Sequence, residues 1–300
     1  MASRWAALVL TRQSSVCHYL SQRSRIFSRY SYLVSESTPM LEAFKEAIRT
    51  DLDDLRTNRR MEKAVMLTAT TGQHFNSTTL PMYFTGSPEA RLVLIHLNPK
   101  QHNEHPHTPT HRPIPAFEQY WAEHQTFGSR MFGRSSLRTH TSPFDHKQIR
   151  FLRPFDTIPF VHEQTRDDRF TNLELALDQK LQLELIPYGS ATFSSVGFTA
   201  PILQPHMERV LAVVAASPRD YVLFCGQIFE LFLHEYITKT HRFKLVKKDG
   251  QPTQNDVRFS NLEINYHGQV IRAGLAHSFA LMGIPMAAYA EQCKEMYGFQ

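Results

Sequence analysis

The chain has 300 residues, of which 42% are hydrophobic and 20% are charged. This composition is that of a globular protein with one large core, and it argues against an intrinsically disordered chain. No apolar run is long enough to span a membrane, and the three cysteines form no CxxC pair, which argues against a disulfide framework and a thiolate zinc site.

The excess of positive charge lies entirely in the first 35 residues. The formal net charge is +5, and residues 1–35 carry five arginines but no lysine and no acid. They are rich in serine and place apolar residues at helical spacing, which is typical of a mitochondrial transit peptide. We therefore expect residues 1–30 to be a transit peptide and the mature protein to lie in the mitochondrial matrix; the alternative is a disordered basic tail. The rest of the chain is formally neutral, so the isoelectric point says nothing about what the folded part binds.

Residues 31–75 are expected to form an N-terminal helix and a linker. An apolar residue recurs every three or four positions within Ser37–Val65, which predicts one helix with a single apolar face. Thr38 can cap this helix, and Pro39 suits its first position.

Residues 76–300 are expected to form a single α/β domain. Four apolar runs, beginning at Leu92, Leu181, Tyr221 and Gln269, predict strands buried on both faces. Helical patterns lie between and after them, at residues 116–127, 171–179, 205–217, 227–240 and 283–299. Alternating residues and turn signals between residues 243 and 271 predict a C-terminal hairpin. The sequence therefore predicts a three-layer α/β fold with a mostly parallel four-stranded central sheet.

Residues 128–153 are the most basic part of the expected domain. Cations that can meet phosphate alternate there with rings that can stack on bases, a pattern that suits single-stranded nucleic acid. The alternative is a solvated loop with buried phenylalanines. The basic residues are Arg130, Arg134, Arg138, Lys147, Arg150 and Arg153, and the interleaved rings are Phe127, Phe132, Phe144 and Phe151.

The first predicted strand ends at a histidine-rich loop. Its histidines are His102, His105, His107 and His111. They lack the spacing of a helical metal motif, and the prolines between them keep the loop extended, so we expect the rim of a cleft rather than a metal site.

Familiar cofactor and nucleophile motifs are missing from the chain. No GxGxxG follows a strand, Arg134 stands where a P-loop needs lysine, and Ser190 is not in a GxSxG motif. We therefore expect neither a metal nor a cofactor.

Four short motifs resemble the uracil-DNA glycosylase superfamily, in the family's order and over residues 78–297. They are "VLIHLNP", "LELIPYG", "VLFCGQIFE" and "RAGLAHSFA". The resemblance implies a uracil-DNA glycosylase-like sheet in which Asn98 positions the hydrolytic water and His277 stabilises the oxyanion of the leaving base. Such chemistry needs a held water and a donor to the departing oxygen. A structural histidine or a helix cap is the other interpretation of His277.

The chain departs from the family at two of these motifs. Ser278 follows His277 where the family has proline, and Pro187-Tyr188 stand where the family has an asparagine that reads the base. In addition, the amide of Asn98 cannot act as a general base.

Two functions fit these residues, one of them non-catalytic and one enzymatic. Residues with which the family recognises the base are missing, which favours a non-catalytic protein that binds RNA or a ribonucleoprotein such as the mitochondrial ribosome. Its contacts would include Arg130, Arg134 and Arg138. The alternative is an N-glycosidic hydrolase in which Asn98 and His277 act at a cleft. Pro99 would line that cleft, and Tyr188 or Phe193 would stack on the base. The expected partner is nucleic acid, with single strands or RNA favoured; a nucleoside-like ligand is the other substrate that the hydrolase could take.

Overall fold

The computed structural model describes residues 39–100, 113–134, 142–244 and 258–276, together with residues 287, 290, 291, 294 and 295. The chain divides into two units, Met1–Thr38 and Pro39–Gln300, and all described residues belong to the second. The predicted transit peptide, the histidine loop, Arg138 and His277 therefore lie outside the described residues.

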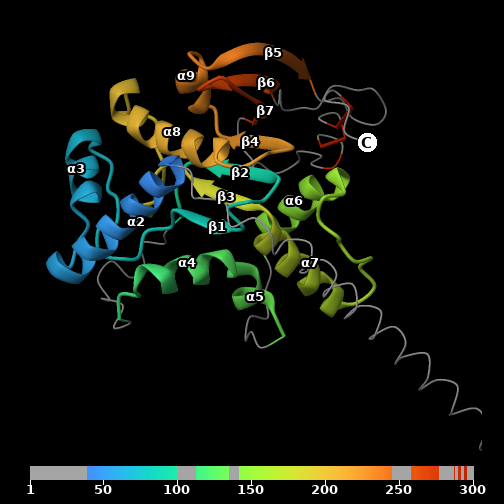
Figure 1. Ribbon diagram of the computed structural model, residues 1–300, viewed down its shortest axis with the longest axis horizontal. Helices are drawn as coiled ribbons and strands as arrows, with labels where there is room; N and C mark the ends of the chain where they lie inside the picture. The colour runs from blue at the N-terminus through green and yellow to red at the C-terminus, as the bar shows by residue number, and fades with distance from the viewer. Residues whose placement is uncertain are drawn as a thin grey trace, which may run out of the picture. The chain divides into compact units, whose positions relative to one another are not determined.

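A mixed seven-stranded sheet forms the centre of the second unit (Figure 1). The strand order is β1-β3-β2-β4-β7-β6-β5. The pairs β3–β2, β2–β4 and β4–β7 are parallel, whereas β1–β3, β7–β6 and β6–β5 are antiparallel. The strands are β1 (Phe84–Gly86), β2 (Leu92–His96), β3 (Leu181–Glu184), β4 (Tyr221–Cys225), β5 (Ile237–Lys244), β6 (Arg258–Tyr266) and β7 (Gln269–Ala276).

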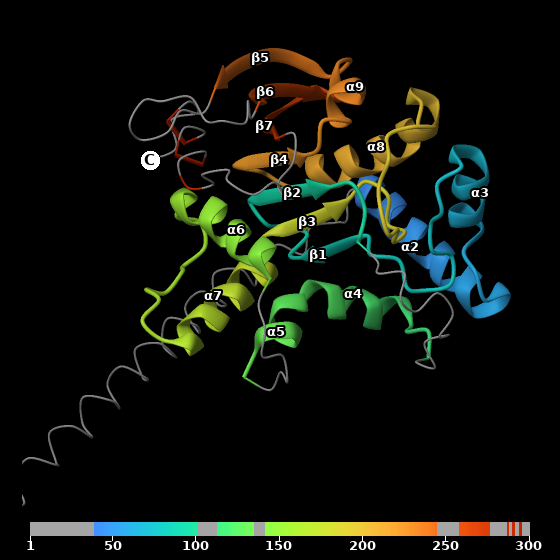
Figure 2. The same ribbon diagram turned by 180° about the vertical axis from the view of Figure 1, so that it is seen from behind.

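The described residues include eight α-helices and one 3-10 helix, which pack on both faces of the sheet (Figures 1 and 2). None of these helices is long and apolar enough to cross a membrane. They are α2 (Pro39–Asn58), α3 (Glu62–Thr71), α4 (Phe117–Gln125), α5 (Phe127–Phe132), α6 (Pro143–Leu152), η1 (Arg153–Phe155), α7 (Arg166–Gln179), α8 (Ala200–Ala215) and α9 (Phe229–Leu233).

Alternate residues of the central strands divide the core into two clusters. In β2, Val93 and Ile95 pack in the cluster that includes α2, α3 and α8, whereas Leu92 and Leu94 pack in the cluster that includes α5, α6 and α7. This division follows from the period of a strand, whose successive side chains point to opposite faces. The result is a three-layer α/β arrangement, and the predicted N-terminal helix and linker are part of the same core.

The predicted four-stranded, mostly parallel sheet is corrected to a mixed sheet of seven strands. Strand β1 has only three residues, Phe84–Gly86, and so short a segment shows no period in the sequence. The predicted hairpin is formed by β6 and β7, and β6 and β5 extend the sheet beyond β7. The turn between β6 and β7 uses His267 and Gly268, whose φ angles of 49° and 82° suit a two-residue hairpin.

Two predicted helices are shorter than expected. The helix predicted over Ser37–Val65 is broken after Asn58, where Arg59 adopts a φ of 59°. The carboxylate of Asp54 accepts a hydrogen bond from the backbone N–H of Glu62 at 3.1 Å, which supports the start of α3. The helix predicted at residues 227–240 is confirmed only for α9, because its second half pairs with β6 as strand β5.

A buried carboxylate joins α2 to the sheet. Asp51 is fully buried, and its Oδ2 accepts hydrogen bonds from the hydroxyls of Tyr83 at 2.7 Å and Tyr188 at 2.9 Å. Tyr83 precedes β1 and Tyr188 follows β3, so one side chain holds three segments that are distant in sequence. Burial raises the pKa of Asp51, and the two hydroxyls partly oppose that shift.

We expect Asp51→Ala to lower the free energy of unfolding by about 3 kcal/mol, because two buried hydroxyls lose their acceptor. Asp53→Ala is the matched control, since the Asp53 side chain is on the same helix and is 69% exposed; it should cost less than about 1 kcal/mol. Urea denaturation followed by circular dichroism measures both. Equal losses in the two variants would contradict the role assigned to Asp51.

Candidate functional site

The loops that follow β2 and β3 run side by side beyond the carboxyl ends of the parallel strands. The backbone N–H of Ile186 donates to Leu97 O at 2.9 Å, and that of Ser190 donates to Pro99 O at 3.1 Å. Lys100 and Ser190 then form an isolated parallel bridge. In sheets of this kind, ligands bind beyond the carboxyl ends of the strands, so this edge is the candidate site.

The side chain of Asn98 is held in one orientation at this edge. Its Nδ2 donates to Ser190 Oγ at 2.7 Å, to Pro99 O at 3.2 Å and to Tyr188 O at 3.3 Å. Two of these acceptors are carbonyl oxygens, which accept hydrogen bonds and cannot donate them. They can therefore pair with the amide nitrogen of Asn98 but not with its oxygen, so the network determines which way the amide faces. No donor among the described residues meets Oδ1, which leaves that oxygen able to accept a hydrogen bond from a water molecule.

Ser190 has a structural role in this arrangement. It is only 5% exposed. Its Oγ accepts from Asn98 and from Gln73 Nε2 at 3.3 Å, and it donates to Thr192 O at 2.9 Å. The hydroxyl proton is thus directed at a backbone carbonyl, and no base from the described part of the chain hydrogen-bonds to Oγ.

The two aromatic residues predicted to stack on a base occupy different environments. Tyr188 is fully buried and its hydroxyl is directed at Asp51, so its ring belongs to the core rather than to the cleft. Phe193 is partly buried and stacks on Phe198, with ring centroids 5.2 Å apart and an angle of 18° between the rings. One face of Phe193 is therefore covered. Sequence reasoning could not distinguish these cases, because the direction of a side chain in a loop has no period.

The interleaved phenylalanines of the basic stretch pack in the core. Phe132 is 5% exposed and Phe151 is 1% exposed, and both belong to the cluster beneath α6 and α7. Phe127 and Phe144 are partly buried against the same cluster. The described part of the stretch therefore follows the alternative interpretation, in which the rings hold the segment to the protein and do not stack on bases.

The predicted basic contacts are not equivalent. Arg130 forms an ion pair with Glu123 at 3.0 Å, so its charge is partly neutralised. Arg134 is exposed and forms no ion pair with a described residue. Arg138 lies outside the described residues, as does His277, so the structure says nothing of either. Pro99 lies beside Asn98 and accepts the hydrogen bonds given above.

A row of polar side chains along β3 was not singled out from the sequence. Lys180 Nζ donates to Gln182 Oε1 at 2.9 Å, and Gln182 Nε2 donates to Glu184 Oε1 at 2.8 Å. Lys180 is fully buried and Glu184 is 4% exposed. The signal that could have revealed the row is the alternation of these residues with leucine in "KLQLEL", which is unexpected in a strand buried on both faces.

Burial pushes the ionisable members of this row toward their uncharged forms. It raises the pKa of Glu184 from 4.5 to about 8, against the opposing effects of Gln182 and Lys180. It lowers the pKa of Lys180 from 10.5 to about 7, against the attraction of Glu184 and other acids. His96 faces Glu184 in the register of β2 and β3, and burial together with Lys180 lowers its pKa to about 3. The row of polar side chains along β3 therefore carries little charge.

The site can bind water or a polar ligand through an oriented amide. Among the described residues, no three His, Cys, Asp or Glu side chains are grouped as a metal site. Comparison with known proteins found no matching family model and no matching curated protein, so a function has to be proposed from the residues and their geometry.

We expect the stability of this protein to depend on the ionisation of Glu184. The folded-state pKa is above the ordinary value, so the folded chain retains a proton that the unfolded chain releases, and the free energy of unfolding falls as pH rises from 4.5 to about 8. Glu184→Gln cannot ionise. The free energy of unfolding of this variant, taken relative to that of the wild type, should therefore increase by on the order of 3 kcal/mol when the pH is raised from about 5 to about 8.

Urea denaturation at both pH values measures this difference. The matched control is Glu46→Gln, because the side chain of Glu46 is 68% exposed and should leave the pH dependence unchanged. A wild type and a Glu184→Gln variant with parallel pH profiles would refute the assignment.

Proposed function

We propose that this chain is a mitochondrial N-glycosidic hydrolase with a uracil-DNA glycosylase-like sheet. The observation that carries the proposal is the orientation of Asn98, whose Nδ2 is bound to three acceptors while Oδ1 has no donor among the described residues. The amide is already ordered before a water molecule binds. Binding the water therefore costs no further loss of side-chain rotational freedom, which is the advantage of a preorganised site.

The proposed reaction is hydrolysis of the bond between a sugar and a nucleobase. Water held by Asn98 Oδ1 adds its oxygen to the anomeric carbon, the C–N bond breaks, and the base leaves with the bonding electrons; the proton that the added water gives up passes through solvent to the departing base, so that a free sugar hydroxyl and a neutral base result. A donor to the base oxygen lowers the cost of that charge, and the resemblance to the glycosylases assigns this donor to His277. A nucleobase in a duplex has to leave the stack before it can be attacked.

The strand pairing supports the finer proposal about the fold. The four motifs that carry the resemblance end the strands β2, β3, β4 and β7, and these four strands are neighbours with parallel pairings. The carboxyl ends of these four strands therefore lie at one edge of the sheet, as a shared site requires. The departures at Tyr188 and at the histidine motif remove the family's uracil-reading asparagine, so mismatched bases are proposed as substrates beside uracil.

We expect the full chain to release a base from uracil- or mismatch-containing DNA, single- or double-stranded. Asn98→Ala should reduce the rate by about 100-fold, because the attacking water is no longer positioned. Ser190→Ala removes one of the three anchors of the amide and should have a smaller effect. The matched control is Asn58→Ala, an exposed asparagine at the end of α2, which should retain full activity. Absence of base release from every substrate would refute the hydrolase.

A second candidate function is the non-catalytic binding of RNA or a ribonucleoprotein. The specific observation in its favour is that Arg134 and Arg150 are exposed and form no ion pair with a described residue, while the phenylalanines of α5 and α6 pack against the core. Cations on a rigid surface suit contacts with phosphate, which position a partner without reading its sequence.

Sedimentation of the full chain with ribosomal particles from an organelle lysate tests this second function. The wild type should move with the particles, and the double variant Arg134→Glu, Arg150→Glu should bind about tenfold more weakly or stay at the top of the gradient. The matched control is Arg60→Glu, Lys239→Glu, which makes the same change of charge at two other exposed positions. Wild-type protein that remains wholly at the top of the gradient would exclude this function.

A further inference from the structure

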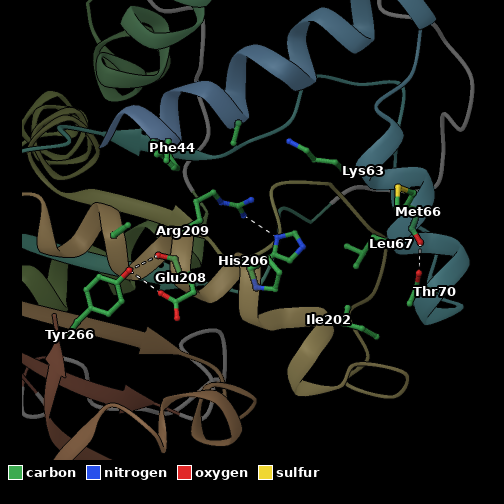
Figure 3. A pocket seen from close by; sticks show the side chains of 14 residues that line it. Phe44, Lys63, Met66, Leu67, Thr70, Ile202, His206, Glu208, Arg209 and Tyr266 are labelled. Carbon is green, nitrogen blue, oxygen red and sulfur yellow. Dashed lines mark hydrogen bonds between the residues drawn. The ribbon is translucent and has the colours of Figure 1, made fainter. Parts of the chain in front are cut away.

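A pocket of about 830 Å³ lies between α2, α3, α8 and the end of β6 (Figure 3). It is on the face of the sheet covered by α2 and α8, and it shares no lining residue with the edge around Asn98. Its volume falls in the range of pockets that hold small molecules, about 300 to 1,000 Å³.

Most of the pocket wall is apolar. Phe44 and Ala47 come from α2, Leu67 from α3 and Ile202 from α8. At the rim, Met66 is 65% exposed, which is unusual for so large an apolar side chain. An apolar chain could lie in this part of the pocket and remove these side chains from water.

Two cations line the pocket, Lys63 and Arg209, and only Lys63 has a carboxylate partner among the described residues. Arg209 Nη2 donates to Leu185 O at 2.8 Å and to His206 Nδ1 at 3.2 Å, but Nη1 and Nε meet no acceptor among the described residues. Arg209 forms no ion pair with a described residue. Lys63 Nζ is 3.7 Å from Asp51 Oδ1, too far for a hydrogen bond, and the Lys63 side chain is 46% exposed. Figure 3 shows both side chains directed toward the space between α2 and α8.

The other titratable groups around the pocket do not neutralise these cations. His206 accepts from Arg209 through Nδ1, so its ring is neutral. The carboxylate of Glu208 lies toward Tyr266 and accepts from the hydroxyls of Tyr236 and Tyr266. Asp51 lies 3.7 Å from Lys63, and the carboxylate of Glu208 is engaged by the two tyrosine hydroxyls. The guanidinium of Arg209 forms no ion pair with a described residue, which leaves a positive charge that suits a single negative charge on a ligand.

We propose that this pocket binds an amphipathic carboxylate, that is, an unbranched apolar chain ending in one carboxylate. The carboxylate would lie between Lys63 and Arg209, where Nη1 can donate to it, and the chain would lie along Phe44, Ala47 and Ile202. The first 35 residues of the protein are a poor occupant, because they carry five arginines and no acid. The proposal goes beyond the hydrolase and does not depend on Asn98.

Calorimetric titration of the full chain with dodecanoate tests the proposal. Butyrate carries the same head without the long chain, and dodecyltrimethylammonium carries the same chain with the opposite charge. We expect binding of dodecanoate alone. Equal binding of dodecanoate and dodecyltrimethylammonium would overturn the proposal, since it would show that only the apolar wall matters, and so would the absence of dodecanoate binding.

Two variants locate the binding. Lys63→Met keeps most of the side-chain volume and removes the charge, so it should weaken dodecanoate binding by about tenfold. Lys239→Met is the matched control, because Lys239 is an exposed lysine on β5 and should leave the affinity unchanged. Ala212→Phe fills the pocket from α8 and should abolish binding. Unchanged affinity in Lys63→Met would overturn the proposal even if Ala212→Phe does not fold.

Discussion

The arrangement of this protein depends on one buried carboxylate. Asp51 accepts hydrogen bonds from Tyr83 and Tyr188, and these three residues come from α2, from the segment before β1 and from the loop after β3. A charged group without water is costly unless it is hydrogen-bonded, so the carboxylate and both hydroxyls have to be placed together. This requirement holds the N-terminal helix against the sheet and sets the direction of the β3 loop.

Tyr188 transmits this constraint to the candidate site. Its hydroxyl donates to Asp51 while its backbone carbonyl accepts from Asn98, so the core and the strand-end edge share one residue. On the opposite side, the second oxygen of Asp51 lies 3.7 Å from Lys63 at the wall of the pocket. Asp51 thus contacts both a residue that holds the Asn98 amide, Tyr188, and a residue that lines the pocket, Lys63, although the amide and the pocket belong to different surfaces of the molecule.

Much of the sheet was predictable, because its central strands are buried on both faces. The runs that begin at Leu92, Leu181, Tyr221 and Gln269 all form strands. A short, continuous apolar run has to be buried on both faces, and a central strand of a covered sheet provides that burial. β1 and β5 were missed for different reasons. β1 is too short to show a period, and β5 continues from a helix in a segment where pairing with β6 outweighs the local preference.

The sequence by itself determined the alternation of strands and helices, the position of Asn98 at a strand end and the segregation of the basic excess in the first 35 residues. These are properties of local period and composition, which need no knowledge of contacts. Only the tertiary structure decided that Tyr188 faces the core, that the phenylalanines of the basic stretch are buried, and that Lys63 and Arg209 line one pocket. The reason is physical: the direction of a loop side chain, and the meeting of α3 with α8, depend on packing between segments more than a hundred residues apart.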